Sequence, residues 1–254
     1  MKSRVLLIAA LICGAFPAGQ AWAANPTIKD GSTLQLGGVT YRLDGVDTPA
    51  LDQVCIDEHA DAWTCGVEAR EQLTRLIGGR AVRCDDLGID PTAKKRHLGV
   101  CTVEGETTSL SELLVRQGFA LNVEASATGR FKPDEARARE NRQGLWKGCF
   151  VAPQEFRRGK KDGTLLGGSC RADRDQEIRE VLFPVDLAMP SGCNIKGKFA
   201  VRARVTGNLG IYHLQACRSY PALTKPDRWF CSEEEAQAAG FRRAYNCSGG
   251  MRSK

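Results

Sequence analysis

The amino-acid sequence predicts an α+β protein: a small five-stranded β-barrel with three packed helices, followed by a second, smaller α+β unit. Three observations lead to this prediction. The expected elements of residues 24–155 follow the order strand, strand, helix, strand, strand, helix, helix, which suits a small closed barrel with helices outside it. A basic, glycine-rich passage without periodicity comes next. Cysteines then recur through the last third of the chain.

The first residues have the features of an export signal. Two basic residues precede an apolar run from Val5 to Phe16, and Ala21-Trp22-Ala23 then matches the small-x-small pattern of a cleavage site. That run is about 12 residues long, whereas a membrane-spanning helix needs roughly 20. We therefore expect residues 1–23 to be a signal peptide, the mature protein to be secreted or periplasmic, and no membrane span elsewhere.

Cysteine usage fits an oxidising compartment. The chain has 11 cysteines, and ten remain once a signal containing Cys13 is removed, an even number that predicts disulfides. Zinc binding is the competing explanation. No Cys-x-x-Cys pair occurs and the three histidines lie far apart in sequence, so we expect no zinc site.

Charge is spread unevenly along the chain, whose formal net charge is +6. Residues 24–150 carry 16 basic and 19 acidic side chains, whereas residues 151–254 carry 18 basic and 11 acidic ones. A protein that binds nucleic acid normally gathers positive charge around its site. Here that charge falls mainly in the C-terminal part, where it either attracts polyanions or solvates the surface.

A β-hairpin is predicted at the start of the barrel. Thr33–Leu36 and Val39–Leu43 alternate apolar and polar residues, and Gly37-Gly38 between them tolerate the positive φ of a tight turn. The short runs Ala81–Cys84 and Leu98–Val103 predict two more strands.

Three helices are predicted around these strands. Apolar residues recur at helical spacing over residues 69–77 and stop at Gly78-Gly79, as in a helix with one face on a core. A Ser-x-x-Glu capping box at residues 109–112 precedes the second helix. Pro133 opens the third, and Gly144 ends it. This order of elements is that of an OB-type barrel.

The passage at residues 156–169 is interpreted as a linker between a first domain, residues 24–155, and a C-terminal domain, residues 170–254. In the C-terminal domain a strand pair is expected around Phe199–Val205 and Gly210–Leu214. A capping box formed by Ser232 and Glu235 then predicts a short helix.

Two arginines are candidate phosphate-binding residues. Hydrolysing a phosphodiester requires an attacking water and stabilisation of the charge on the phosphoryl oxygens. Arginine suits the second task because its planar guanidinium donates two hydrogen bonds to phosphate at once. Arg42 on the hairpin and Arg96 in the run Lys94-Lys95-Arg96-His97-Leu98 are the candidates. Since a single arginine is usually only a surface charge, the surrounding motifs decide.

These motifs resemble those of the staphylococcal nuclease (thermonuclease) family over roughly residues 27–150. The resemblance implies an OB-fold domain and a family activity, the calcium-dependent hydrolysis of phosphodiester bonds in nucleic acids. Five sequence blocks carry it in the family's order: Asp30-Gly31-Ser32-Thr33, Arg42 to Ala50, Lys94 to Gly99, Leu114 to Ala120, and Gly144-Leu145-Trp146.

Carried over residue by residue, the resemblance makes Arg42 and Arg96 the catalytic arginines and assigns calcium to Asp47 and the carbonyl of Thr48. Two positions depart from the family pattern: Ser32 stands in place of a second calcium aspartate, and Ala50 in place of the general-base glutamate. A positioned general base contributes about 10²–10⁴ in rate, and calcium affinity depends on the number of anionic ligands. We therefore expect impaired catalysis and weak or absent calcium binding.

Two nearby carboxylates offer a way to restore the site. Asp44 lies two residues after Arg42 and so points to the same face of the strand, where it would ligate the metal or pair with Arg42. Asp52 lies two residues beyond Ala50 and would reach back from the loop. An active calcium-dependent nuclease that uses one of these carboxylates is the alternative function.

Two disulfides are expected in the first domain. Cys84 ends one predicted strand and Cys101 lies in the next, so they form our best single pairing. Cys55 and Cys65 bracket a loop beside the site, which a bridge would make rigid. The remaining cysteines allow 15 connectivities, and they are Cys149, Cys170, Cys193, Cys217, Cys231 and Cys247.

The C-terminal domain resembles an extension of exported bacterial nuclease-like proteins, among them rhizobial proteins associated by name with succinoglycan biosynthesis. The resemblance lies in three stretches, Cys193 to Gly197, Ile211-Tyr212-His213, and Trp229 to Phe241. We expect an exported binding or structural protein that binds nucleic acid or another polyanion weakly. An envelope protein linked to exopolysaccharide biosynthesis is a further alternative, and the sequence identifies no protein partner.

Overall fold

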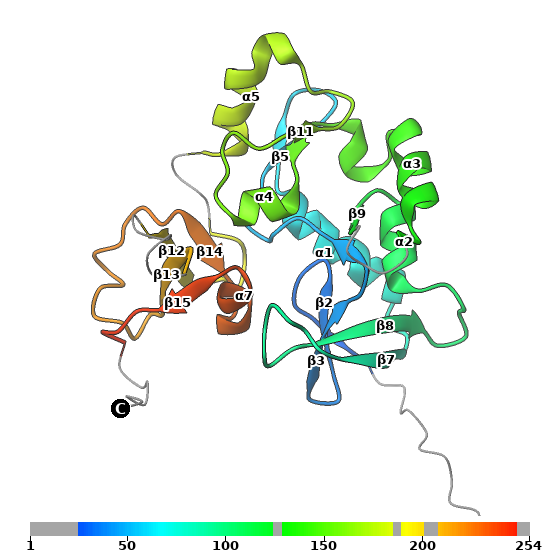
Figure 1. The fold of residues 1–254 in the computed structure, drawn as a ribbon, viewed down its shortest axis with the longest axis horizontal. Coiled ribbons are helices and arrows are strands. Elements are labelled where there is room, and N and C mark those ends of the chain that lie inside the picture. The colour runs from blue at the N-terminus through cyan, green and yellow to red at the C-terminus, as the bar shows by residue number, and fades with distance from the viewer. Residues whose placement is uncertain (1–24, 124–128, 185–188, 201–207, 248–254) are drawn as a thin grey trace, which may run out of the picture.

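The structure of the protein is a computed structural model, and it describes residues 25–123, 129–184, 189–200 and 208–247. The predicted signal peptide, residues 1–23, lies outside the described residues. Figure 1 shows an α+β molecule in which a sheet with helices against it and a second, smaller sheet lie side by side. The candidate site forms where these two parts meet.

Five strands form the main sheet in the order β1-β2-β3-β8-β7. Strands β3 and β8 pair in parallel, and the other neighbours are antiparallel. Pairings among the described residues leave β1 and β7 at the two edges, so the α+β class is confirmed while the closed barrel stays a prediction. The strands are β1 (Thr27–Ile28), β2 (Thr33–Leu36), β3 (Val39–Leu43), β7 (Val82–Ile89) and β8 (His97–Val103).

Strands β2 and β3 form the predicted hairpin. Gly37 and Gly38 have φ angles of 55° and 89°, a left-handed pair that glycine adopts without strain and that a tight hairpin turn requires. Side chains alternate along β3, so Tyr41 and Leu43 are buried in the core while Arg42 between them is partly exposed on the other face. The hairpin thus directs Arg42 away from the core.

Three helices occur where the sequence predicts them. Helix α1 ends at Gly78, which has a left-handed backbone with φ 59°. The Ser109 side chain accepts a hydrogen bond from the backbone N–H of Glu112 at 3.1 Å, the predicted capping box of α2. Buried residues of α1 and α2 share one core cluster with the main sheet. The helices are α1 (Cys65–Ile77), α2 (Leu110–Arg116) and α3 (Lys132–Glu140).

Short strands and single-turn helices connect these elements. Strand β4 pairs with β9, β5 with β6, and β10 with β11, each pair antiparallel. The β4–β9 pairing fixes the chain at Asp47, the start of the site loop. The connecting elements are β4 (Val46–Asp47), β5 (Cys55–Ile56), β6 (Ala62–Trp63), β9 (Leu121–Asn122), η1 (Gly144–Lys147), β10 (Phe150–Val151), β11 (Leu165–Leu166) and η2 (Ala172–Arg174).

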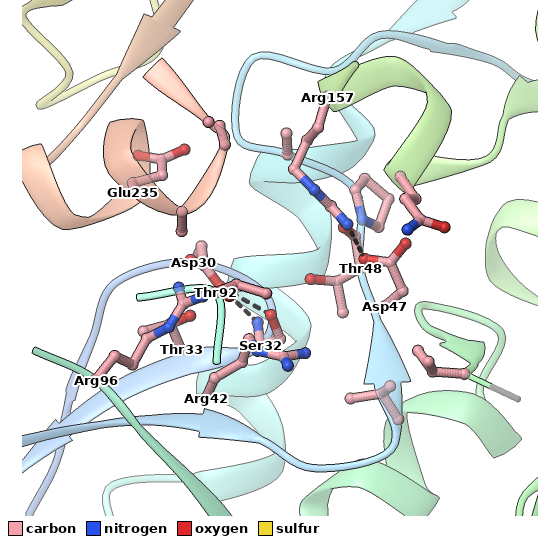
Figure 2. A pocket seen from close by; sticks show the side chains of 18 of the residues that line it. Asp30, Ser32, Thr33, Arg42, Asp47, Thr48, Thr92, Arg96, Arg157 and Glu235 are labelled. Atoms are coloured by element: carbon pink, nitrogen blue, oxygen red, sulfur yellow. Dashed lines mark hydrogen bonds and ion pairs between the residues drawn. The ribbon is translucent and has the colours of Figure 1, made fainter. Parts of the chain in front are cut away.

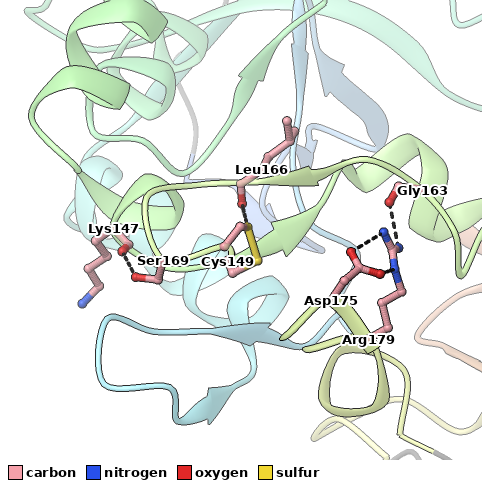
Figure 3. Close-up of a disulfide and its surroundings, with 8 residues drawn as sticks. Lys147, Cys149, Gly163, Leu166, Ser169, Asp175 and Arg179 are labelled. Atoms are coloured by element: carbon pink, nitrogen blue, oxygen red, sulfur yellow. Dashed lines mark hydrogen bonds and ion pairs between the residues drawn. A yellow bond between two sulfur atoms is a disulfide. The ribbon is translucent and has the colours of Figure 1, made fainter. Parts of the chain in front are cut away.

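Residues 156–169, predicted to be a linker, are instead folded against the first domain. Helix α4 (Pro153–Arg157) ends within this segment, and β11 in its middle pairs with β10. A disulfide between Cys149 and Cys170 closes the segment at its end (Figure 3). The glycine-rich composition was misleading because partners outside the segment hold it, and such partners leave no periodic signal in the segment itself.

Helix α5 (Asp175–Leu182) also packs on the first domain, so the second unit begins later than the predicted residue 170. Its buried side chains join a core cluster that includes Ile56. Arg179 of α5 donates a hydrogen bond to the carbonyl of Gly163 at 2.8 Å, as Figure 3 shows. The chain is therefore tied down on both sides of η2.

A four-stranded sheet with order β14-β12-β13-β15 forms the second unit, in which β13 and β15 are parallel. The predicted strand at residues 199–205 is shifted, because β12 ends at Phe199 and residues 201–207 lie outside the described residues. Ser232 caps α7 by accepting from the backbone N–H of Glu235 at 3.1 Å, as predicted. The elements are β12 (Ile195–Phe199), β13 (Gly210–His213), β14 (Arg228–Phe230), α7 (Glu233–Ala238) and β15 (Phe241–Arg243).

Five disulfides use all ten cysteines of residues 24–254, including the two pairings expected from the sequence. None of the helices in the described part of the chain is long and apolar enough to cross a membrane. The disulfides are Cys55–Cys65, Cys84–Cys101, Cys149–Cys170, Cys193–Cys231 and Cys217–Cys247.

Candidate functional site

A cleft of about 410 Å³ lies between the first domain and the C-terminal unit, a volume within the usual range of ligand pockets. Figure 2 shows side chains that enter it from three directions. Arg42 and Arg96 come from the main sheet and the turn before β8, Arg157 from the end of α4, and Glu235 from α7. The cleft therefore needs segments from both parts of the chain.

The two predicted arginines meet at one buried carboxylate, Asp90. Arg42 Nε donates to Asp90 Oδ2 at 2.9 Å, and Arg96 Nε donates to the same oxygen at 2.8 Å. The other oxygen of Asp90 accepts from the backbone N–H and the hydroxyl of Thr92 at 2.9 and 2.7 Å. Asp90 was not identified from the sequence, although the Asp90-Pro91-Thr92 turn was a usable signal.

Asp90 stays ionised over the whole physiological range. Burial of its side chain opposes the charge, yet hydrogen bonds from Arg42 and Thr92 and the charge of Arg42 lower the pKa of Asp90 to about 2. Among the described residues Asp90 is the acceptor for Arg42, through Nε alone. The Nη groups of Arg42 are therefore available to bind an anion in the cleft.

Ser32, at the departed calcium position, is turned toward its own loop. Its backbone N–H and hydroxyl lie 2.7 and 3.2 Å from Asp30 Oδ1, the geometry of an Asx turn. Ser32 lines the cleft but brings no negative charge to it. The loop keeps its shape without the second carboxylate that calcium would need.

Arg157 occupies the two remaining calcium donors. Its Nη2 group donates to the carboxylate of Asp47, and its Nη1 group donates to the carbonyl of Thr48 at 3.2 Å (Figure 2). No group of three or more His, Cys, Asp or Glu residues able to hold a metal occurs among the described residues. A divalent cation does not fit this set, because its two donors already bind a guanidinium and Ser32 is neutral.

Comparison with known proteins follows this geometry. Residues 40–148 match the family model described as Staphylococcal nuclease homologue. These residues form a staphylococcal nuclease-like domain. A relative of the chain is the succinoglycan biosynthesis protein ExoI of Rhizobium meliloti (strain 1021), which is 27% identical over 146 residues that cover 55% of this chain and 75% of that protein.

The nuclease-like domain contains the carboxylates Asp44 and Asp52, but neither lines the cleft. Asp44 forms an ion pair with Arg130. Asp52 binds Arg228 of β14, with Oδ2 to Nε at 2.7 Å and Oδ1 to Nη2 at 2.9 Å. Both carboxylates are thus committed to arginines outside the site. The relocated ligand or base that the alternative function requires is not supplied by either residue in this geometry.

Glu235 brings a carboxylate to the cleft from outside the nuclease-like domain. Its Oε2 accepts a hydrogen bond from the backbone N–H of Cys231 at 2.8 Å. Burial and the nearby charges of Asp30 and Asp52 raise the pKa of Glu235 to about 8, against weaker opposing effects of that hydrogen bond and of Arg228. Glu235 was recognised in the sequence only as a helix cap, because no local pattern links α7 to the domain it faces.

Proposed function

We propose that the protein binds the phosphodiester backbone of single-stranded nucleic acid in the cleft and hydrolyses it poorly or not at all. The observation that carries this proposal is the pair Arg42 and Arg96, fixed by one buried carboxylate at the wall of a cleft. Pre-oriented guanidinium groups bind phosphate strongly because little side-chain freedom is lost on binding.

Impaired hydrolysis is supported by three features of the same cleft. Ala50 supplies no general base, a loss of about 10²–10⁴ in rate. Ser32 supplies no calcium carboxylate, and Asp47 is paired with Arg157. Each feature removes a part of water activation, whereas none removes a phosphate-binding arginine.

Export to the periplasm or the medium is part of the proposal. Five disulfides support it, because such bonds persist in oxidising compartments. The signal-like residues at the N-terminus support it as well.

Fluorescence anisotropy with a labelled single-stranded oligothymidylate tests the proposal. Arg42→Ala/Arg96→Ala will weaken binding by about tenfold or more and lower the salt dependence of log Kd by about two. The control is Arg75→Ala/Arg83→Ala, which removes two exposed arginines outside the cleft. Equal affinity of the cleft variant and the control would contradict the proposal.

A cleavage assay separates binding from the alternative function. With calcium present, the wild-type protein will leave the oligonucleotide intact on the timescale on which an active nuclease digests it. Rapid digestion by the wild type, abolished in Asp44→Ala or Asp52→Ala, would instead establish an active nuclease with relocated carboxylates.

The name of the relative supports a second candidate function, a role in exopolysaccharide biosynthesis. Deleting the gene in its own host and measuring exopolysaccharide yield tests this role. A normal yield in the deletion strain would exclude it. A reduced yield that Arg42→Ala/Arg96→Ala restores as well as the wild type would show that the role does not use the cleft.

A further inference from the structure

We infer that Arg157 is a built-in replacement for the divalent cation of the nuclease-like domain, so that the cleft binds phosphate groups without a metal ion. This inference rests on the proposed function. It goes further in assigning to one side chain, outside the matched family region, the place that the resemblance gives to calcium.

The position of Arg157 follows from its acceptors. Its two donor groups reach one carboxylate and one backbone carbonyl, Asp47 and Thr48. These are unlike ligands on adjacent residues, and both would face a cation bound at the start of the site loop. A guanidinium placed on both of them stands where that cation would stand.

The main chain holds Arg157 in this place from both sides. Helix α4 is anchored through buried Phe156 and, beyond it, by the Cys149–Cys170 disulfide. The carbonyl of Arg157 lies 3.4 Å from Nη1 of Arg228, which itself binds Asp52. Arg157 is thus a fixed part of the fold rather than a flexible surface side chain.

Arg157 keeps donors free for a ligand. A guanidinium has five N–H donors, and among the described residues Arg157 uses two of them, toward Asp47 and Thr48. Its side chain is 31% exposed and lines the same cleft as Arg42 and Arg96. Figure 2 shows Arg157 and Arg42 entering the cleft from opposite sides. A phosphate between them would meet cationic donors on both sides.

The replacement separates binding from catalysis. A guanidinium is charged at every pH of interest and suits phosphate oxygens, so it supplies the charge neutralisation that a metal ion gives a bound phosphate. It does not coordinate water and so does not lower the pKa of water as a divalent ion does. Arg157 therefore preserves binding while leaving the nucleophile inactive.

Oligonucleotide binding in the presence of EDTA or calcium tests the inference. The wild type will bind the labelled oligothymidylate equally, within about twofold, in both buffers. Arg157→Ala will bind about tenfold more weakly in EDTA, and Arg157→Lys will retain part of the affinity. Arg174→Ala, which removes an exposed arginine outside the cleft, is the matched control and will bind as the wild type does. Wild-type binding that requires calcium, or unchanged binding by Arg157→Ala, would overturn the inference.

Calorimetric titration with calcium alone tests the replacement without nucleic acid. The wild type and Ser32→Asp will show no binding at about millimolar calcium, because Arg157 still covers the donors. Ser32→Asp/Arg157→Ala will bind calcium, because two carboxylates and a carbonyl are then exposed together. Equal calcium affinity of Ser32→Asp and the double variant would refute the replacement.

The two titrations also distinguish the inference from the proposed function. If the wild type binds no oligonucleotide in either buffer, the proposed function fails. The calcium titration then decides the inference by itself, since its outcome depends only on whether Arg157 covers the donors.

Discussion

Asp90 illustrates how one buried carboxylate sets the geometry of two arginines. A buried ion pair contributes little net stability when complete, but losing one partner costs about 3–5 kcal/mol because a charge is left uncompensated. The pKa of Asp90 is about 2 in the fold against an ordinary 3.8. Its contribution is therefore fully present above about pH 4 and is lost as the pH falls through 2.

Glu235 shows the opposite behaviour, and Glu235→Gln tests it. Its pKa is about 8 in the fold against an ordinary 4.5, so the folded state holds a proton that the unfolded state has released. Stability therefore falls as the pH rises from about 4.5 to about 8 and changes no further above that range. Glu235→Gln keeps an oxygen acceptor for the Cys231 N–H and removes this decline.

Melting temperatures measured between about pH 5 and pH 9 will therefore fall less steeply for Glu235→Gln than for the wild type. Glu234→Gln, on the same helix but outside the cleft, is the control and will follow the wild type. Parallel curves for the wild type and Glu235→Gln would show that Glu235 does not titrate in this range.

At the residue scale, sequence reasoning identified the groups that the family motifs mark. Arg42, Arg96, Asp47 and Thr48 all line the cleft. It did not identify Arg157, because the partners of that arginine lie more than 100 positions earlier in the chain. A side chain whose role depends on a distant contact leaves no trace in local spacing.

Helix α1 is the element that positions the site loop. Its second residue, Gly66, lies so close to that loop that a Cβ there would be 1.8 Å from the carbonyl oxygen of Ala50. The helix N-terminus and the backbone of Ala50 and Leu51 are thus in direct contact. Only glycine allows this approach, which holds the segment that follows Asp47 and Thr48 in place.

Gly66→Ala will destabilise the protein by about 3 kcal/mol, since overpacking forces the backbone to move. Urea denaturation measures this change. Gly79→Ala is the control, because a Cβ at Gly79 meets nothing within 4 Å and meets only the strain of its positive φ, 73°, about 1–2 kcal/mol. A smaller loss for Gly66→Ala than for the control would argue against the close packing of α1 on the loop.

Elements with local signals were predicted well, and elements held by distant partners were not. The β2–β3 hairpin and helices α1 to α3 were found because turn glycines, capping boxes and apolar spacing lie within each element. Helix α4 and strand β11 were predicted as linker because only five and two residues form them. Their stability comes from the Cys149–Cys170 disulfide and the β10 partner, which no short window of sequence contains.

At the scale of the whole molecule, one buried ion pair joins the C-terminal unit to the nuclease-like domain. The side chains of Asp52 and Arg228 are 0% and 2% exposed, and the backbone N–H of Trp229 also donates to Asp52 at 3.0 Å. The guanidinium of Arg228 stacks near the rings of Phe156 and Phe230 as well. This contact keeps α7 over the cleft.

Arg228→Met will loosen this junction. The buried Asp52 carboxylate loses its partner at a cost of about 3–5 kcal/mol, whereas Asp52→Asn/Arg228→Met removes both charges and costs less. Limited proteolysis will release the C-terminal unit faster from the single variant than from the wild type or the double variant. Equal resistance of all three proteins would show that the ion pair does not govern docking.

The placement of Arg157 after the matched family region has a consequence for dissecting this protein. A fragment cut at residue 148 would retain Arg42, Asp90 and Arg96 but would lose the guanidinium on Asp47 and the carboxyl group of Glu235. Such a fragment would present vacant calcium donors and a cleft open on one side. Its ion requirement and its pH response would then be properties of the excised piece, not of the intact polypeptide.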